Sequence, residues 1–238
     1  MLIGHGSTNA PAAARPLLDH AEVIRSSGRF AEVAVGMLRG QPDAGAAFDG
    51  LTAPIVHVVP YFLEDGFFTR IALPELLLPK ATGSRVIRFC HPLGTHRGIA
   101  ALIEARVNRH CDIFGIAPPS LSVLLVGHGS RQNPGRARAL RQHAARLETG
   151  GRFGWVRIAH LEEPPLVPET LAGARGRVVA VVGYFAIEGM HVVEDLPNLI
   201  AREQKLRGTN WPPVYDLGSI GTDEAIPRML LDQVAIEA

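Results

Sequence analysis

The sequence predicts an α/β protein made of two tandem copies of one unit, each a four-stranded parallel sheet with helices on both faces. Three observations predict this fold. The chain of 238 residues repeats itself at one fixed offset. Within each copy, short apolar runs alternate with segments of helical spacing. The run Arg177–Phe185 is almost continuously apolar and rich in β-branched residues, which is typical of a strand covered on both faces.

The duplication is visible without gaps. His5 and His128 both lie in the sequence GHGS, 123 positions apart (128 − 5). The same offset pairs GRF at Gly28–Phe30 with GRF at Gly151–Phe153, and Tyr61–Phe62 with Tyr184–Phe185. We therefore expect an N-terminal domain at residues 1–118 and a C-terminal domain at residues 119–238, related by a pseudo-twofold axis. Gly115–Ser122, which contains Pro and Ser, is predicted to link them.

Strands are predicted where short apolar runs occur. In the second copy these runs are Leu121–Gly127, Trp155–Leu161, Arg177–Phe185 and Pro212–Gly218. In the first copy the run Met1–Gly4 is short, and Ser84–Cys90 is the last strand. Because each run is followed by a segment of helical spacing, the strands are expected to be parallel.

Helices are predicted after each strand from their apolar spacing. In the second copy the helical segments are Asn133–Glu148, Val167–Ala174, Val192–Gln204 and Thr222–Gln233, and the first copy ends in the helix Thr95–Val107. Asn133 is a candidate cap and Pro134 suits a first turn. Pro197 must lie early in its helix or kink it.

Polar residues follow three neighbouring strands of the second copy. His128 follows the first strand, Glu162 and Glu163 end the second, and His191 follows the third. Since ligands bind beyond the carboxyl ends of the strands in such sheets, we expect these side chains at one rim. Two imidazoles and a carboxylate suit a borderline divalent metal such as Fe²⁺, Co²⁺ or Ni²⁺, and they suit proton transfer equally.

Other interpretations of these residues stay open. His128 between two glycines also fits a phosphate-binding turn in which the imidazole is incidental. A phosphohistidine enzyme with His128 as nucleophile is a further alternative, although Gly127 stands where histidine phosphatases have arginine. A lone histidine at a helix start, such as His191, can be purely structural.

The first copy lacks most of this set. His5 is present, but Phe68 stands at the position of His191, and Arg39 and Gly40 stand at the positions of the two acids. We expect one working site per chain, with the first copy supplying an apolar and cationic wall for a flat, acidic ligand. The alternative is that Phe68 and its neighbour Phe67 simply fill the core.

Composition excludes several classes. The formal net charge of +1 does not favour nucleic acid, and no apolar run is long enough for a bilayer. The only cysteines, Cys90 and Cys111, form no CxxC pair, so a disulfide framework or zinc knuckle is not expected. The first ten residues lack a basic start and a long apolar core, so we expect no signal peptide and a cytoplasmic protein.

Four segments together resemble the CbiX/SirB family of class II chelatases: LLVGHGS at Leu124–Ser130, AHLEEPPL at Ala159–Leu166, VVGYFAIEGMHVVEDLP at Val181–Pro197 and LGSIGTDEAI at Leu217–Ile226. The resemblance implies a chelatase-like, flavodoxin-like fold in a long form with two fused copies, working as a monomer. It implies insertion of a divalent metal into sirohydrochlorin without ATP or a permanently bound cofactor, on the way to siroheme or cobalamin. The absence of a His-rich tract favours Fe²⁺ over Co²⁺.

The resemblance also implies roles for residues. His128, His191 and Glu162 would be catalytic, and these with Glu163 would be the metal ligands. The residues expected to bind the carboxylate-rich substrate are His5, Ser130, Arg131, Arg39, Phe68, Arg70 and Arg97. Two other functions remain as alternatives: a non-catalytic tetrapyrrole or metal carrier, and the phosphoryl-transfer enzyme named above.

Overall fold

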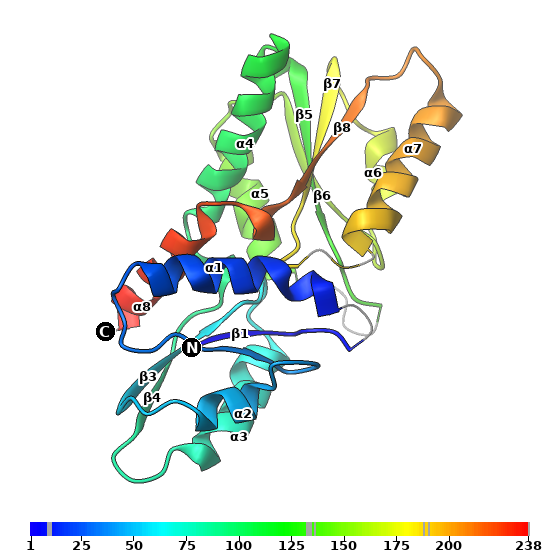
Figure 1. Cartoon of the computed structure of the whole chain (residues 1–238). Coiled ribbons are helices and arrows are strands. Elements are labelled where there is room, and N and C mark those ends of the chain that lie inside the picture. The colour runs from blue at the N-terminus through cyan, green and yellow to red at the C-terminus, as the bar shows by residue number, and fades with distance from the viewer. Residues whose placement is uncertain (9–10, 132–134, 136, 188, 190, 238) are drawn as a thin grey trace. The chain divides into compact units, whose positions relative to one another are not determined.

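The computed structural model describes residues 1–8, 11–131, 135, 137–187, 189 and 191–237. It contains two four-stranded sheets in which every paired strand is parallel, in the orders β2-β1-β3-β4 and β6-β5-β7-β8 (Figure 1). The predicted fold class is therefore confirmed. This is the strand order of flavodoxin-like sheets without the fifth strand.

The strands of the first sheet are β1 (Leu2–Gly4), β2 (Val35–Met37), β3 (Ile55–Pro60) and β4 (Val86–Phe89), and those of the second are β5 (Leu121–Gly127), β6 (Trp155–His160), β7 (Val178–Gly183) and β8 (Val214–Ser219). The helices are α1 (Arg15–Ser26), α2 (Ala44–Asp49), α3 (Leu73–Leu77), α4 (Ile99–Phe114), α5 (Arg138–Thr149), α6 (Val167–Ala172), α7 (Leu196–Arg207) and α8 (Ile226–Glu237).

The second sheet is covered on both faces, as its apolar strands predict. Every residue of β5 and of β7 is buried. Figure 1 shows α4 and α5 on one face of this sheet and α6 and α7 on the other. Leu124 and Val126 of β5 pack with Leu171 of α6 and Ile200 of α7 in one core cluster. Burial of these strands fixes the register, so the residues that follow each strand are held at a defined edge.

The last helix of each repeat belongs to the compact unit of the other repeat. One unit consists of Met1–His96 with Gly221–Ala238, and the other of Arg97–Ile220. In the second unit, the Arg106 guanidinium of α4 donates a 2.8 Å hydrogen bond to the Ser219 carbonyl at the end of β8. The expected domains, residues 1–118 and 119–238, follow the repeats of the sequence, whereas each compact unit takes the last helix of the other repeat.

The first unit receives α8 through equally specific contacts. The Gln233 side chain of α8 donates a 3.1 Å hydrogen bond to the Pro92 carbonyl, and this side chain is buried. The carbonyl of Gly221, at the start of this segment, accepts hydrogen bonds from His20 Nε2 (2.9 Å) and from the Tyr61 hydroxyl (2.6 Å). Buried polar groups that are satisfied in this way specify where α8 docks.

Four predicted helices begin later in the structure than expected. The helices expected from Thr95 and Thr222 are α4 and α8, which begin at Ile99 and Ile226. The helix expected from residue 133 is α5, which begins at Arg138; the expected cap and first-turn proline, Asn133 and Pro134, lie outside the described residues. The helix expected from Val192 begins as a wide turn, His191–Asp195, before α7. Pro197 lies in the first turn of α7, a position where proline is tolerated, so the expectation of an early proline is confirmed.

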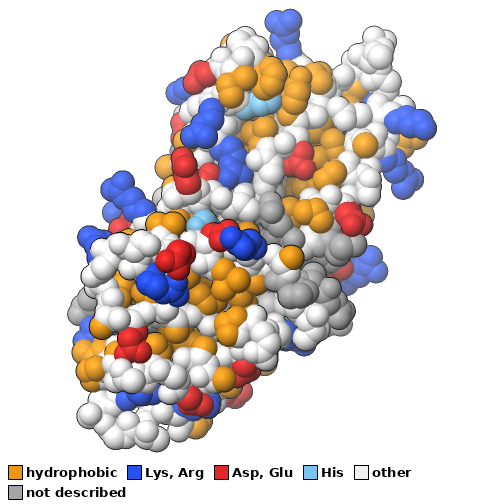
Figure 2. All heavy atoms as spheres, in the orientation of Figure 1, with side chains coloured by type: hydrophobic (Ala, Val, Ile, Leu, Met, Phe, Trp, Pro, Cys, Tyr) orange, Lys and Arg blue, Asp and Glu red, His pale blue; other side chains and the backbone are white. Residues whose placement is uncertain are grey.

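An exposed apolar patch lies at the amino ends of the strands in the second unit. Ile113 and Phe114 at the end of α4 are exposed, and the Phe114 ring stacks on Tyr215 of β8 with centroids 5.5 Å apart. The upper part of Figure 2 shows hydrophobic side chains gathered there. Since His128 follows the carboxyl end of β5, the patch lies at the opposite edge of this sheet. None of the described helices is long and apolar enough to span a bilayer.

Burial of His20 predicts that the protein loses stability in mild acid. Burial lowers the pKa of His20 below its usual 6.5, more than the Gly221 carbonyl raises it. As the pH falls below 6.5, the unfolded chain therefore binds a proton before the folded chain does, and the free energy of unfolding decreases. We expect the urea midpoint to be constant above this pH and to fall below it. The variant His20→Gln should show a weaker pH dependence between pH 7.5 and 5.5, and an unchanged slope would contradict this assignment.

Candidate functional site at the carboxyl edge of the second sheet

His128 and Glu162 lie side by side where β5 and β6 end. The parallel ladder continues beyond the strands, because Leu161 N–H donates to the Gly127 carbonyl (3.1 Å) and Glu162 N–H donates to the His128 carbonyl (3.0 Å). The side chains meet with His128 Nδ1 3.8 Å from Glu162 Oε2, and they are 46% and 38% exposed. Both groups are therefore available to a ligand at this edge.

The imidazole of His128 has a defined orientation. Its Nδ1 lies 3.0 Å from the Gly129 carbonyl oxygen. In the tautomer that donates this hydrogen bond, Nε2 carries the lone pair that can bind a metal ion or accept a proton. Gly129 has φ of +74°, a conformation that favours glycine and turns the chain sharply after His128.

The two adjacent acids point in different directions. Glu163 is buried, with Oε1 3.7 Å from Nε2 of the buried His160 and Oε2 accepting a 2.9 Å hydrogen bond from Gly135 N–H. Burial lowers the pKa of His160, more than Glu163 raises it. The two acids are predicted together as metal ligands, but of the pair only Glu162 lies at the exposed rim.

The third predicted member of the set is His191. It begins the turn His191–Asp195, which follows β7, so its backbone is on the chain segment that the sequence predicts. The structure describes the backbone of His191 but not its side chain. Among the residues that the structure describes, no three His, Cys, Asp or Glu side chains are grouped closely enough to hold a metal ion.

The first repeat has the same local architecture with different side chains. His5 follows β1, and Arg39 N–H donates to its carbonyl (2.8 Å), as Glu162 does to that of His128. Phe68 begins a wide turn, Phe68–Ala72, and its ring meets the His5 ring edge-on with centroids 4.8 Å apart. Burial, with a smaller contribution from Arg39, lowers the pKa of His5.

The aromatic residues of the first repeat form an exposed surface beside His5. Phe68 also stacks on Phe62 (5.8 Å between centroids) and contacts Phe67 (5.6 Å). Phe67 is 54% and Phe68 36% exposed, so these rings do not simply fill the core. The surface can receive a flat ligand.

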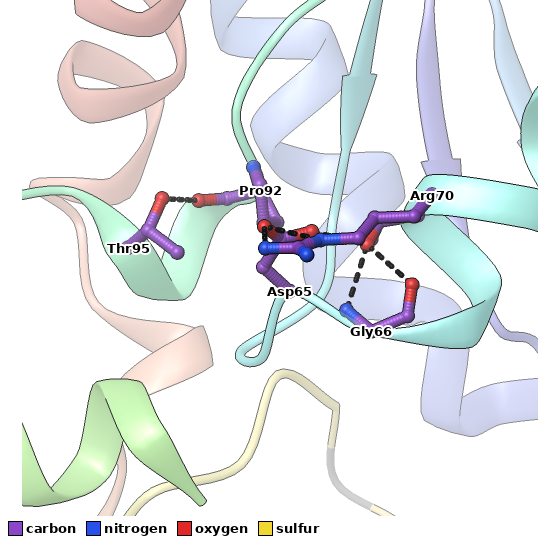
Figure 3. A network of polar contacts seen from close by, with 6 residues as sticks. Asp65, Gly66, Arg70, Pro92 and Thr95 are labelled. Atoms are coloured by element: carbon purple, nitrogen blue, oxygen red, sulfur yellow. Dashed lines mark hydrogen bonds and ion pairs between the residues drawn. The ribbon is translucent and has the colours of Figure 1, made fainter. Parts of the chain in front are cut away.

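The predicted cationic residues differ in how they are held. Arg70 donates from Nε (2.9 Å) and Nη2 (2.6 Å) to Asp65 Oδ2, as Figure 3 shows, and this bond lowers the pKa of Asp65. Arg97, expected to belong with the first copy, is part of the second unit because it leads into α4, and its carbonyl accepts a 3.3 Å hydrogen bond from Arg146. Arg39, Arg97 and Arg131 are exposed, and Ser130 is half-buried next to the His128 turn.

The loops after β5 and β7 diverge at this edge. The helix after β5 covers one face of the sheet and the helix after β7 covers the other (Figure 1). This is a topological switch point, the place where open α/β sheets bind ligands. The fold and its edge thus define a tandem-repeat α/β protein with a histidine–glutamate site at the switch point of one sheet.

The chain belongs to the CbiX family, whose model matches residues 1–110 and 122–237. A probable sirohydrochlorin cobaltochelatase of Halobacterium salinarum is 27% identical over 269 residues, covering 99% of this chain and 90% of that protein. Among solved structures, a multi-domain protein of Deinococcus radiodurans with structural similarity to chelatases matches with a TM-score of 0.85 at 27% identity. The match covers 100% of this chain, which spans about half (54%) of that one.

Two further structures support the fold. SirB from Bacillus subtilis, solved with Fe³⁺, matches with a TM-score of 0.80 at 23% identity and 94% coverage of that chain. The sirohydrochlorin chelatase SirB from Bacillus subtilis subspecies spizizenii, in complex with cobalt, matches with a TM-score of 0.76 at 22% identity and 93% coverage. Both matches cover 100% of this chain, so the doubled sheet arrangement is shared along its whole length.

Proposed function

We propose that this protein is a sirohydrochlorin chelatase, a lyase that inserts a divalent metal ion into sirohydrochlorin without ATP. The observation that carries the proposal is the pair of His128 and Glu162, 3.8 Å apart and exposed at the switch point of the second sheet. The site occurs in a CbiX-family chain, and the equivalent edge of the first repeat has Arg39 in place of the acid.

The chemistry of metallation divides naturally among such groups. The inner pyrrole protons must leave the macrocycle while the metal ion enters it. A neutral imidazole can hold the ion or accept a proton, but one nitrogen lone pair cannot do both at once. We assign metal delivery and proton acceptance to His128 and His191, with Glu162 holding the ion or relaying protons. The ligand set must be weak, because the ion has to pass to the ring.

The first repeat supports the role of His191. Phe68 and His191 occupy the same position of the repeat, 123 residues apart (191 − 68), and each begins a wide turn after the third strand. In the first repeat this position brings the Phe68 ring to 4.8 Å from that of His5. We propose that the second repeat uses the same geometry to direct two imidazoles to one metal ion.

Recognition of the substrate is proposed to use aromatic and cationic side chains. The exposed rings of Phe67 and Phe68 suit a face of the macrocycle. The carboxylates of sirohydrochlorin suit guanidinium groups, for which Arg39, Arg97 and Arg131 are exposed. Arg70 is the weakest of the candidates, since Asp65 already accepts its hydrogen bonds.

The proposed working form of the protein is a single chain with its two substrates. One chain carries both repeats, so we propose that it works as a monomer in the cytoplasm, with sirohydrochlorin and the metal ion as its only small-molecule partners. The metal is a substrate, and no permanently bound cofactor is part of the proposal. On the face in Figure 2, basic and acidic side chains are interspersed, in keeping with the net charge of +1.

An anaerobic assay tests the function. Protein, sirohydrochlorin and Fe²⁺ or Co²⁺ are mixed, and the visible spectrum of the pigment is followed against a protein-free control. We expect metallation to accelerate in proportion to protein concentration. A carrier would bind the pigment without acceleration, and acid-labile phosphate trapped on His128 would support phosphoryl transfer instead. Competition between the two metals decides between iron, which the missing His-rich tract favours, and cobalt, which the Halobacterium relative is named for.

A further inference from the structure

Gly135, on the segment between His128 and α5, is held from two sides by charged side chains. Its N–H donates a 2.9 Å hydrogen bond to Oε2 of the buried Glu163. Its carbonyl accepts a hydrogen bond from the Arg141 guanidinium of α5. A hydrogen bond to an ionised partner is stronger than one between neutral groups, so the two bonds hold the backbone on both sides of the Gly135 Cα atom.

Glu163 also supports the turn directly beneath His128. A Cβ atom added at Gly129 would come within 2.7 Å of Glu163 Cγ and 2.8 Å of His160 Cβ. The backbone next to His128 therefore rests on the buried side chains that end β6. One acid thus contacts the turn at Gly129 and holds Gly135, two points of the segment that leaves His128.

The first repeat provides an internal control for the role of these contacts. At the same offset of 123, Gly40 stands for Glu163 (163 − 123), Ala12 for Gly135 (135 − 123) and Leu18 for Arg141 (141 − 123). The first sheet nevertheless forms with the same strand order and the same parallel pairing. The fold of a repeat does not require these contacts, and they occur in the repeat that keeps His128 with Glu162.

We propose that Glu163 is a positioning residue for metallation, which fixes the backbone at Gly129 and at Gly135 and thereby aims the His128 imidazole and places Ser130 and Arg131 toward the substrate. This rests on the proposed chelatase function. Glu163 acts through the backbone and does not touch the metal. Its side chain is needed as a hydrogen-bond acceptor, a task that the amide oxygen of glutamine can also perform.

The test compares Glu163→Ala, Glu163→Gln and Glu162→Gln in the full-length protein. Glu163→Ala should lower kcat for metallation by about 10- to 100-fold, as losses of residues that orient a metal site usually do. Glu163→Gln should stay within about threefold of wild type, because its amide oxygen still accepts the hydrogen bond from Gly135 N–H, although a bond to a neutral acceptor is weaker. Neither should change the KM for Co²⁺, whereas Glu162→Gln should raise it. Glu203→Ala, which removes another buried carboxylate, paired with Arg207 in α7, is the matched control.

Hydrogen–deuterium exchange tests the positioning role of Glu163 independently of the proposed chelatase function. Peptides covering residues 129–137 should exchange faster in Glu163→Ala, remain protected in Glu163→Gln, and be unchanged in Glu203→Ala. This readout holds even if the wild-type protein does not metallate sirohydrochlorin, in which case only the chelatase function fails. Wild-type exchange and turnover in Glu163→Ala would overturn the positioning role. Equal loss in Glu163→Gln with a raised KM for Co²⁺ would make Glu163 a metal ligand instead.

Discussion

Replacing His128 by alanine is expected to lower kcat/KM for metallation by about a hundred- to ten-thousand-fold, the usual range for losing a general acid–base group. The imidazole lies at the switch point beside Glu162. Among the described residues, no other exposed histidine side chain follows a strand at this edge of the second sheet, since His160 is buried. The fold should persist, because the His128 side chain is 46% exposed and surface substitutions usually change the free energy of unfolding by less than about 0.5 kcal/mol. Initial rates from the visible spectrum and a thermal melt measure both effects.

His5→Ala is the matched control for this variant. His5 occupies the same position in the first repeat, follows the first strand in the same way, and contacts Phe68 in place of a carboxylate. Its loss should reduce kcat/KM far less, through the aromatic surface it supports. If the two variants lose activity equally, the two repeats share the chemistry, and the assignment of one working site per chain is wrong.

The second sheet could be predicted from the sequence because its two central strands, β5 and β7, are buried on both faces. The runs Leu121–Gly127 and Val178–Gly183 are almost continuously apolar, and their alternation with segments of helical spacing indicates covered parallel strands. Because the two repeats match at one offset of 123 positions (128 − 5), a strand predicted in one copy also predicts the equivalent strand in the other. The edge with His128 and Glu162 follows from the same logic, since parallel strands end together.

The exchange of α4 and α8 could not be predicted in this way. An amphipathic helix shows in its sequence which face is buried, but not which sheet covers that face. The deciding contacts are long-range and specific: Arg106 with the Ser219 carbonyl in one unit, and Gln233 with the Pro92 carbonyl in the other. No local pattern around Arg106 or Gln233 marks these partners.

The different environments of the adjacent acids Glu162 and Glu163 could not be predicted from the sequence either. Glu162 and Glu163 are adjacent and chemically identical, and only the turn after β6 decides that the first is exposed and the second buried. Arg70 is similar, because its pairing with Asp65 depends on the conformation of the turn between them. Comparison of the repeats does contain a signal for Glu163. In the copy without the second histidine, Gly40 stands in place of Glu163 and Leu18 in place of Arg141.

Substituting phenylalanine for His191 is expected to abolish most metallation while sirohydrochlorin still binds. The variant gives the second repeat the side chain that the first repeat has at this position, Phe68, so the turn His191–Asp195 should accept it. With one imidazole left, His128 would have to hold the metal ion and accept a proton, which one lone pair cannot do at the same time. We expect kcat to fall by about a hundredfold or more, with the pigment dissociation constant from absorbance titration changed by less than threefold, about 0.7 kcal/mol.

Val193→Phe separates the loss of the imidazole from the added bulk. Val193 lies in the same turn and is 54% exposed, so a phenyl ring there enlarges the turn without removing any candidate ligand. This variant should keep near wild-type turnover. Because both variants add an aromatic ring to one turn, only a difference between them can be attributed to the nitrogen atoms of His191. If His191→Phe metallates as fast as Val193→Phe, then His128 and Glu162 suffice, and the division of tasks between two imidazoles is refuted.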